Sequence, residues 1–122
     1  MPSTDDSLKD GLLTVEQLDE GPRLRLALHG ELDLSNAKKV EAALTEAFAS
    51  EKQILVDLTQ LEFLDSTGIA LLVATLQRHD AARLSFLPSE SRDVRRLLNL
   101  TGLDRRMALS KTGGASPTPS AI

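Results

Sequence analysis

The first part of the chain alternates between apolar and polar residues, with a turn in the middle. Apolar side chains recur between residues 12 and 18, and in residues 23–29 leucine at positions 24, 26 and 28 alternates with Arg, Ala and His. Because the side chains of a strand point to opposite faces in turn, this period of two predicts half-buried strands. The Gly21-Pro22 pair between them is typical of a turn. The pattern therefore predicts a β-hairpin.

Helical spacing governs the apolar residues of three later segments. Apolar positions three and four residues apart predict helices over residues 37–50 and 66–79, and a third helix with Val94, Leu97 and Leu98 on its inner face. Residues suited to begin or end these helices flank them. They are Ser35 or Asn36 before the first helix, Ser89 before the third, and Gly102 with Leu103 after it.

Further strands are predicted between and after these helices. Residues 54–58 form a nearly continuous apolar run, which suits a central strand that is covered on both faces. A loop is expected over residues 59–65, another strand over 83–87 and a last strand over 107–109. Because strands alternate with helices after a hairpin, this order predicts an α/β domain with a mixed sheet of four to five strands.

The two ends of the chain differ in composition from its middle. Residues 1–10 are acidic and polar, which predicts a flexible lead rather than a signal peptide. Residues 111–122 are rich in Gly, Ser, Thr and Pro, and such low-complexity sequence predicts a disordered tail. The remaining residues, 11–110, fit one domain of ordinary size.

The residue inventory narrows the classes of function. The chain has no Cys, only two His and no Gly-rich phosphate loop, so we expect no metal site, no cofactor and no enzymatic activity. The apolar run over residues 69–76 is too short to span a bilayer, which predicts a cytoplasmic protein without membrane insertion. With 2% aromatic residues and a net charge of -4, direct binding of nucleic acid is not expected either.

The net charge conceals an asymmetry along the chain. Residues 1–77 carry 6 basic and 14 acidic side chains, whereas residues 78–122 carry 8 basic and 4 acidic ones. A solvated helix face explains such a pattern, and so does a surface with opposed electrostatic ends that steers a charged partner. Both interpretations stay open at the level of the sequence.

The junction Asp65-Ser66-Thr67-Gly68 links the expected loop to the second helix. Asp65 suits the N-cap position, because its carboxylate can accept a hydrogen bond from the free N–H of Thr67 or Gly68. Ser66 would then be the first helical residue, with its hydroxyl directed outward near the positive end of the helix dipole. A phosphate there would add about -1.5 to -2 charges without disturbing the helix. From spacing alone, a plain helix start explains the same four residues.

Three segments resemble the STAS domain, and within it the bacterial anti-sigma factor antagonists. Residues 28–33 (Leu-His-Gly-Glu-Leu-Asp) resemble the family's Gly-Glu-(Leu/Ile)-Asp signature. Residues 56–58 (Val-Asp-Leu), with residues 63–68 (Phe-Leu-Asp-Ser-Thr-Gly), resemble its central strand and phosphorylation loop. Residues 97–103 resemble the end of the helix before its last strand. The resemblance spans residues 12–110 and implies a STAS fold with helices packed mainly on one face of the sheet.

This resemblance implies a regulatory function. In the family, the serine that follows the loop aspartate is phosphorylated by a partner, an anti-sigma factor with serine kinase activity, and that position is Ser66 here. The unphosphorylated protein binds the anti-sigma factor and so releases a sigma factor. The phosphorylated protein lets go, and a separate serine phosphatase restores it. Thr67 matches the family's second hydroxyl and is the alternative acceptor.

The resemblance also implies roles for acidic residues near Ser66. Asp33 is expected to contact the partner and Asp57 to support the adjacent loop, while simple capping stays open for both. The expected partner-binding residues are Glu31, Asp33, Glu62, Asp65, Ser66, Thr67 and Gly68. Family members often end with a further helix, for which residues 111–122 hold no apolar period, so an exposed sheet face or weak self-association is expected.

Three other functions remain as alternatives. A STAS subunit of a transporter or of a stress-signalling complex would have the same fold without phosphorylation of Ser66. A receiver domain would use Asp57 as its acceptor, but the acidic pair Asp19-Glu20 falls at the hairpin turn, where it cannot hold the Mg²⁺ that such a domain needs. A nucleotide-hydrolysing enzyme would need a phosphate-binding loop that the sequence does not contain.

Overall fold

The computed structural model describes residues 12–106. Its elements in chain order are β1 (Leu13–Asp19), β2 (Arg23–Leu32), α2 (Ala37–Phe48), β3 (Gln53–Asp57), β4 (Leu61–Leu64), α3 (Ser66–Arg78), the 3₁₀ turn η1 (Ala81–Arg83), β5 (Leu84–Leu87), α4 (Arg92–Leu100) and α5 (Leu103–Arg106). The lead expected over residues 1–10, the tail expected over 111–122 and the strand expected over 107–109 lie outside the described residues.

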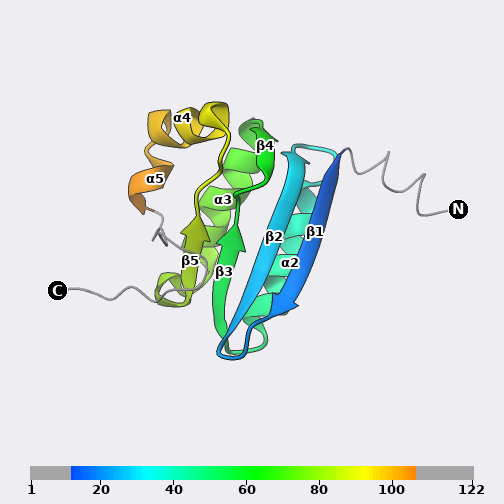
Figure 1. Cartoon of the computed structure of the whole chain (residues 1–122). Helices are drawn as coiled ribbons and strands as arrows, with labels where there is room; N and C mark the ends of the chain where they lie inside the picture. Colours follow the sequence, from blue (N-terminus) through cyan, green and yellow to red (C-terminus); the bar gives the residue numbers. More distant parts are fainter. Residues whose placement is uncertain (1–11, 107–122) are drawn as a thin grey trace, which may run out of the picture.

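The strands form one mixed sheet with a parallel centre (Figure 1). β1 and β2 form the predicted antiparallel hairpin, and β3 pairs in parallel with β2 on one side and with β5 on the other. All residues of β3 except the first are buried, as the continuous apolar run of a central strand predicts. The predicted α/β fold with a mixed sheet is therefore confirmed.

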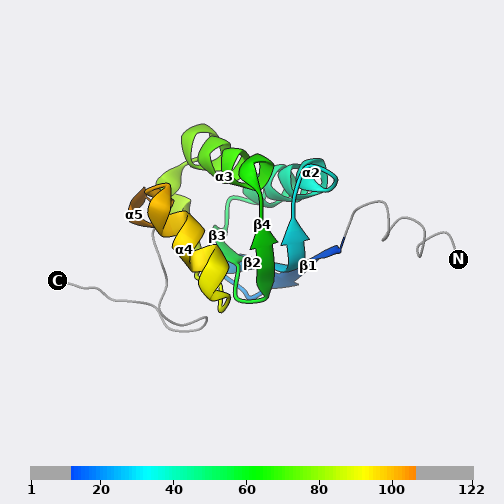
Figure 2. The ribbon, with the colours of Figure 1, turned by 90° about the horizontal axis from the view of Figure 1, so that it is seen from above.

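α2 and α3 cover one face of the sheet, and the hydrophobic core lies between these two layers (Figure 2). The buried side chains that meet there are, on the strands, Leu24, Leu26, Ile54, Val56, Leu84 and Phe86, and, on the helices, Val40, Leu44 and Leu72. α4 and α5 lie beside β4 and β5, at the side of the sheet away from β1 (Figures 1 and 2). The apolar side chains of the strands and those of α2 and α3 thus pack against each other in one hydrophobic layer.

The segment expected as a loop over residues 59–65 contains a short strand, so that prediction is wrong. β4 pairs in parallel with the last residues of β2, beyond the point where β3 ends. Its outer two residues are buried and its middle two are exposed, and the pairing register shifts between Gly30 and Glu31 of the partner strand. A four-residue strand without a period of two offers no pattern from which it could be predicted.

β2 also runs farther than predicted, because Gly30, Glu31 and Leu32 continue the strand instead of connecting it to α2. Gly30 has a φ of +112°, and a Cβ atom there would lie 1.7 Å from the carbonyl oxygen of Leu12. Only glycine adopts this conformation readily and leaves room for the neighbouring backbone. Gly30 therefore lets β2 pass close to the backbone of Leu12, just before β1, and continue into its pairing with β4.

The start of α4 differs from the prediction. Ser91, not Ser89, is the N-cap, and Ser91 Oγ accepts a hydrogen bond from Val94 N at 3.4 Å. Ser89 is buried, and its Oγ donates to the carbonyl oxygen of Leu61 at 2.6 Å while it accepts from Ser91 N at 2.9 Å. This serine therefore fixes the chain before α4 to β4. At the other end of α4, Gly102 has the predicted left-handed conformation, with a φ of +78°.

Candidate functional site

α3 begins at Ser66, directly after β4 and its following residue Asp65. Asp65 is the N-cap, and its Oδ1 accepts a hydrogen bond from Gly68 N at 3.0 Å, which confirms the predicted cap. Ser66 is exposed, whereas Thr67 is half buried. Ser66 is therefore accessible at a helix start, where backbone N–H groups lack partners within the helix and the helix dipole is positive.

Gly68 seats the first turn of α3 tightly on the sheet. A Cβ atom at Gly68 would lie 2.5 Å from Leu64 Cδ1, 3.0 Å from Leu32 Cγ and 3.1 Å from the carbonyl oxygen of Leu32. These separations are shorter than the roughly 3.5–4.0 Å of an ordinary carbon contact. The helix that carries Ser66 thus rests directly on the ends of β2 and β4.

The loop after β2 lies beside this helix start. Leu32 and Leu64 are partners in the parallel pairing of β2 with β4, and the carbonyl oxygen of Leu32 accepts a hydrogen bond from Asp65 N at 3.3 Å. Asp33 follows Leu32 as Asp65 follows Leu64, so the two aspartates leave neighbouring parallel strands at the same edge. The structure therefore brings Asp33, expected at the partner surface, next to the Asp65-Ser66 pair.

Asn36 fixes the conformation of the loop that carries Asp33. It is buried, its Oδ1 accepts from Asp33 N at 3.0 Å, and its Nδ2 donates to the carbonyl oxygen of Glu31 at 2.8 Å. Asn36 stands at the N-cap position of α2, but its side chain makes no capping hydrogen bond, so the predicted side-chain cap is wrong. The carboxylate of Asp33 accepts from Ser35 N at 3.0 Å and from Ser35 Oγ at 2.6 Å.

Asp57 lies on the other face of the sheet from α3. Its neighbour Val56 belongs to the core, and strand alternation turns Asp57 the opposite way. Asp57 Oδ1 accepts from Thr59 N at 2.9 Å and from Thr59 Oγ1 at 2.7 Å, and Oδ2 accepts from Arg25 Nη1 at 3.0 Å. Burial raises the pKa of Asp57, but the hydrogen bonds from Thr59 and the Arg25 guanidinium outweigh it and hold the pKa below its ordinary value. Asp57 thus bonds to the loop before β4, on the face of the sheet opposite α3.

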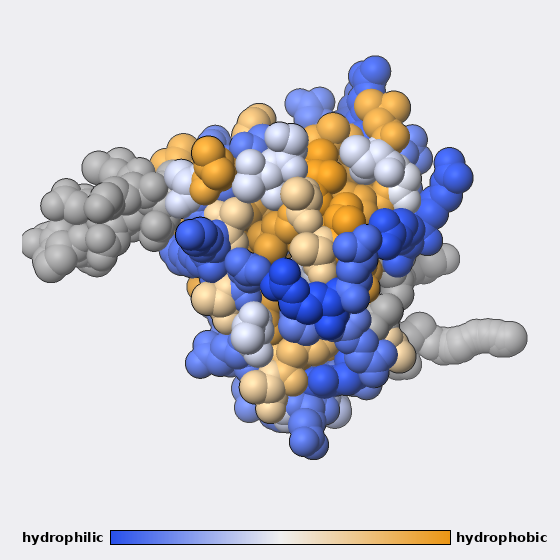
Figure 3. All heavy atoms as spheres, turned by 180° about the vertical axis from the view of Figure 1, so that it is seen from behind, coloured by the Kyte–Doolittle hydropathy of each residue, from blue (hydrophilic) through white to orange (hydrophobic). Residues whose placement is uncertain are grey.

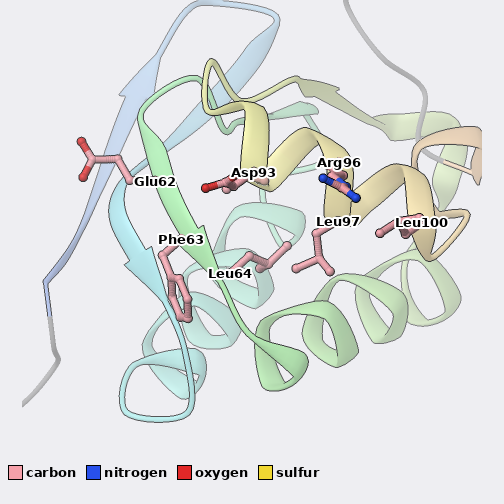
Figure 4. Close-up of a pocket in the computed structure, with 8 residues that line it drawn as sticks. Glu62, Phe63, Leu64, Asp93, Arg96, Leu97 and Leu100 are labelled. Atoms are coloured by element: carbon pink, nitrogen blue, oxygen red, sulfur yellow. The ribbon is translucent and has the colours of Figure 1, made fainter.

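β4 places two exposed side chains before Ser66. Glu62 and Phe63 are both exposed, Phe63 with 47% of its surface accessible. They border a groove of about 270 Å³ between β4 and α4 (Figure 4). Of the expected partner-binding residues, Glu62 is therefore the one that lines this groove.

Sequence reasoning missed the α4 side of this groove. Its lining residues on α4 include Asp93, Arg96, Leu97 and Leu100, which are spaced at i, i+3, i+4 and i+7 and so share one helix face. Leu97 was expected on the inner face and is half buried, while Leu100 is 70% exposed. The only sign of this wall in the sequence was that apolar and charged residues share that face of α4.

Residues 12–106 hold no group of three or more acidic or imidazole side chains that could bind a metal ion. In the same range, every helix is too short or too polar to cross a membrane.

Comparisons with known proteins agree with this geometry. Residues 14–115 match the STAS domain family. The chain is 33% identical over 101 residues to the anti-sigma-F factor antagonist RsfB of Mycobacterium tuberculosis, and the matched region covers 82% of this chain and 83% of that protein. A solved anti-sigma factor antagonist from Mycobacterium paratuberculosis superimposes with a TM-score of 0.75 and 27% identity, over 85% of this chain and 89% of that one. The anti-sigma factor antagonist SpoIIAA in its unphosphorylated form has the same fold, with a TM-score of 0.65 and 21% identity over 80% of this chain and 89% of that one. The chain therefore belongs to the STAS domain family, among the anti-sigma factor antagonists.

Proposed function

We propose that this protein binds an anti-sigma factor, and thereby releases a sigma factor, through a surface centred on Ser66. We call this the Ser66 surface, and it comprises the exposed or half-buried residues Glu31, Asp33, Glu62, Asp65, Ser66 and Thr67. The observation that carries the proposal is the exposed Ser66 on a capped helix start, with Asp65 before it and the Asp33 loop beside it. Buried Gly68 contributes the close seating of that helix rather than a contact of its own.

We further propose that phosphorylation of Ser66 ends this binding. A phosphate adds about -1.5 to -2 charges. The free N–H groups and the dipole of α3 favour an anion at this position, so the fold is retained. An unpaired charge enclosed in an interface costs several kcal/mol, and about 3 kcal/mol already corresponds to more than a hundredfold in affinity. The anti-sigma factor acts as the serine kinase, and a serine phosphatase reverses the modification.

The acceptor is tested by phosphorylation in vitro. The purified chain is incubated with candidate anti-sigma factor kinases and ATP, and the modified residue is mapped by mass spectrometry. We expect one phosphate, on Ser66, in the wild type and in the Thr67→Ala variant, and none in Ser66→Ala. A phosphate on Thr67 in the wild type, or undiminished modification of Ser66→Ala, would contradict the proposal.

The switch is tested by binding to the purified anti-sigma factor. Ser66→Ala is expected to bind as the wild type does, and Ser66→Asp and the enzymatically phosphorylated protein are expected to lose binding. Thr45→Asp is the matched control, because Thr45 is exposed on α2 and the substitution adds the same charge away from Ser66. The switch is refuted when the phosphorylated protein binds as tightly as the unphosphorylated one.

A further inference from the structure

The groove between β4 and α4 adjoins the Ser66 surface. β4 contributes Phe63 and Leu64 to the groove and then runs through Asp65 into Ser66 (Figure 4). The groove and the helix start are therefore neighbouring parts of one surface, joined by the chain itself. A partner that covers Ser66 can reach the groove without leaving that surface.

The groove has apolar walls. Leu64 and Val94 are buried at its base, Leu97 is half buried, and Phe63 and Leu100 are 47% and 70% exposed. Figure 3 shows apolar surface gathered at the end of the molecule where β4 and α4 lie. Large apolar side chains exposed together around a hollow, with a polar rim, are typical of a protein interaction site.

Charged side chains line the groove together with these apolar residues. Glu62 and Asp93 both line it, and Arg96 lies one turn along α4 from Asp93. Among residues 12–106, no hydrogen bond or ion pair engages the carboxylate of Glu62 or of Asp93. The groove therefore has two carboxylates against the one guanidinium of Arg96, and Asp33 and Asp65 add to this acidic excess on the adjoining Ser66 surface, which favours a basic partner.

We propose that this groove anchors an amphipathic helix of the anti-sigma factor. One large apolar side chain of that helix fills the space between Phe63 and Leu100, and a basic residue one turn away pairs with Glu62 and Asp93. A groove of this composition takes a helix through apolar anchors at i, i+3 and i+4 spacing. The inference rests on the proposed function, since the same anti-sigma factor contacts the Ser66 surface. It adds that contacts in the groove supply much of the binding affinity, while phosphorylation of Ser66 controls whether the complex forms.

A second copy of the chain fits the groove less well. Outside the groove, the exposed large apolar side chains of residues 12–106 are Leu12, Leu18 and Leu34, with 64%, 37% and 77% of their surfaces accessible. Leu18 and Leu34 each have an aspartate as their direct neighbour in sequence, Asp19 and Asp33, and Asp10 stands two positions before Leu12. In the groove these aspartates would add to the excess of carboxylates over the single guanidinium of Arg96, which opposes association.

The proposal is tested by substitutions that leave the core intact. Leu100→Asp places a charge at an exposed groove residue, and we expect binding to the purified anti-sigma factor to weaken roughly 30-fold or more, the loss that defines an interface hot spot. Asp93→Lys is expected to weaken binding in the same direction. Leu18→Asp is the matched control on β1, and we expect it to bind as the wild type does. Far-ultraviolet circular dichroism of each variant checks that it is folded.

A second measurement on the wild type does not depend on any variant. Amide hydrogen exchange of the wild-type complex should show protection of α4 around Leu97 and Leu100 as well as of the first turn of α3. Protection of α3 without α4, together with wild-type binding by Leu100→Asp and loss of binding by Ser66→Asp, overturns the groove and leaves the Ser66 switch standing. Loss of binding by Leu100→Asp with unaffected binding by the phosphorylated protein supports the groove and overturns the switch. A wild-type dimer in sedimentation velocity that Leu100→Asp dissociates assigns the groove to a second copy and overturns the proposal.

Discussion

Replacement of Gly68 by alanine sets two effects of opposite sign against each other. In an exposed helix, Gly→Ala stabilises by up to about 1 kcal/mol because alanine restricts the unfolded chain and favours the helix. At Gly68 the added Cβ would lie 2.5 Å from Leu64 Cδ1 and 3.1 Å from the carbonyl oxygen of Leu32. The end of the Leu64 side chain can shift, but the backbone oxygen cannot shift without disturbing the pairing of β2 with β4. Overpacking of this kind costs about 1–3 kcal/mol.

The loss therefore equals or exceeds the gain, and we expect Gly68→Ala to lower the free energy of unfolding by up to about 2 kcal/mol. In a domain of this size that corresponds to a fall in Tm of roughly 4–8 °C for each kcal/mol. The chain has no Trp and no Tyr, so urea unfolding is followed by far-ultraviolet circular dichroism rather than by fluorescence. The m-value should stay unchanged, because the same surface becomes exposed on unfolding.

Measuring Gly68→Ala in a Leu64→Ala background shows how much of this loss comes from the contact with Leu64. Leu64→Ala alone should cost about 2–5 kcal/mol, because Leu64 is a buried core residue. It also removes Leu64 Cδ1 but leaves the Leu32 carbonyl oxygen, which would still lie 3.1 Å from the new Cβ. Adding Gly68→Ala should therefore cost less there than in the wild type, and the remaining cost reports the contact with Leu32. A Gly68→Ala protein that is more stable than the wild type would refute the close-contact reasoning, and equal costs in the two backgrounds would assign the whole loss to the contacts with Leu32.

Three further outcomes are expected from the described contacts. Asp65→Ala should lower the free energy of unfolding by about 0.5–2 kcal/mol in urea titrations, because α3 loses its N-cap. Asp57 has a lowered pKa, since hydrogen bonds from Thr59 and Arg25 outweigh its burial. It therefore stabilises the fold above pH ~4 and less as pH falls below that value, so Asp57→Asn should flatten the acid limb of stability against pH. The pKa of His79 is lowered by burial and by the charges of two neighbouring arginines. The wild type should thus lose stability as pH falls below ~6.5, and His79→Gln should remove that part of the loss in urea titrations at pH 7.5 and 5.5.

The elements with dense patterns were predictable from the sequence. Leucine at every second position predicted residues 23–29 of β2, and a continuous apolar run predicted β3, because a strand buried on one face and a strand buried on both have different sequence patterns. β4 could not be predicted, since two of its four residues are exposed and its pairing starts after a register shift. Ser89 and Ser91 illustrate a finer limit. Both can cap α4 by their chemistry, and only the tertiary bond from Ser89 to the carbonyl oxygen of Leu61 decides between them.

The candidate site divides in the same way. The cap at Asp65 and the exposure of Ser66 follow from neighbours in the sequence, so local rules sufficed. The closeness of Asp33 to Ser66 depends on the pairing of β2 with β4, which is a contact between distant segments. The groove depends on a second such contact, between β4 and α4. No periodicity within one segment encodes which other segment it will meet.

The position of Ser66 in the first turn of α3 constrains any enzyme that modifies it. A serine in an extended loop can enter an active site as part of a strand-like peptide, whereas Ser66 is held by the hydrogen bond from Gly68 to Asp65 and by the packing of Gly68 on Leu32 and Leu64. A kinase or phosphatase must therefore bind the folded domain rather than an extended peptide segment around Ser66. Under the proposed function, substrate choice is a matter of shape and is tied to the integrity of the fold, so that an unfolded copy of this protein would escape modification.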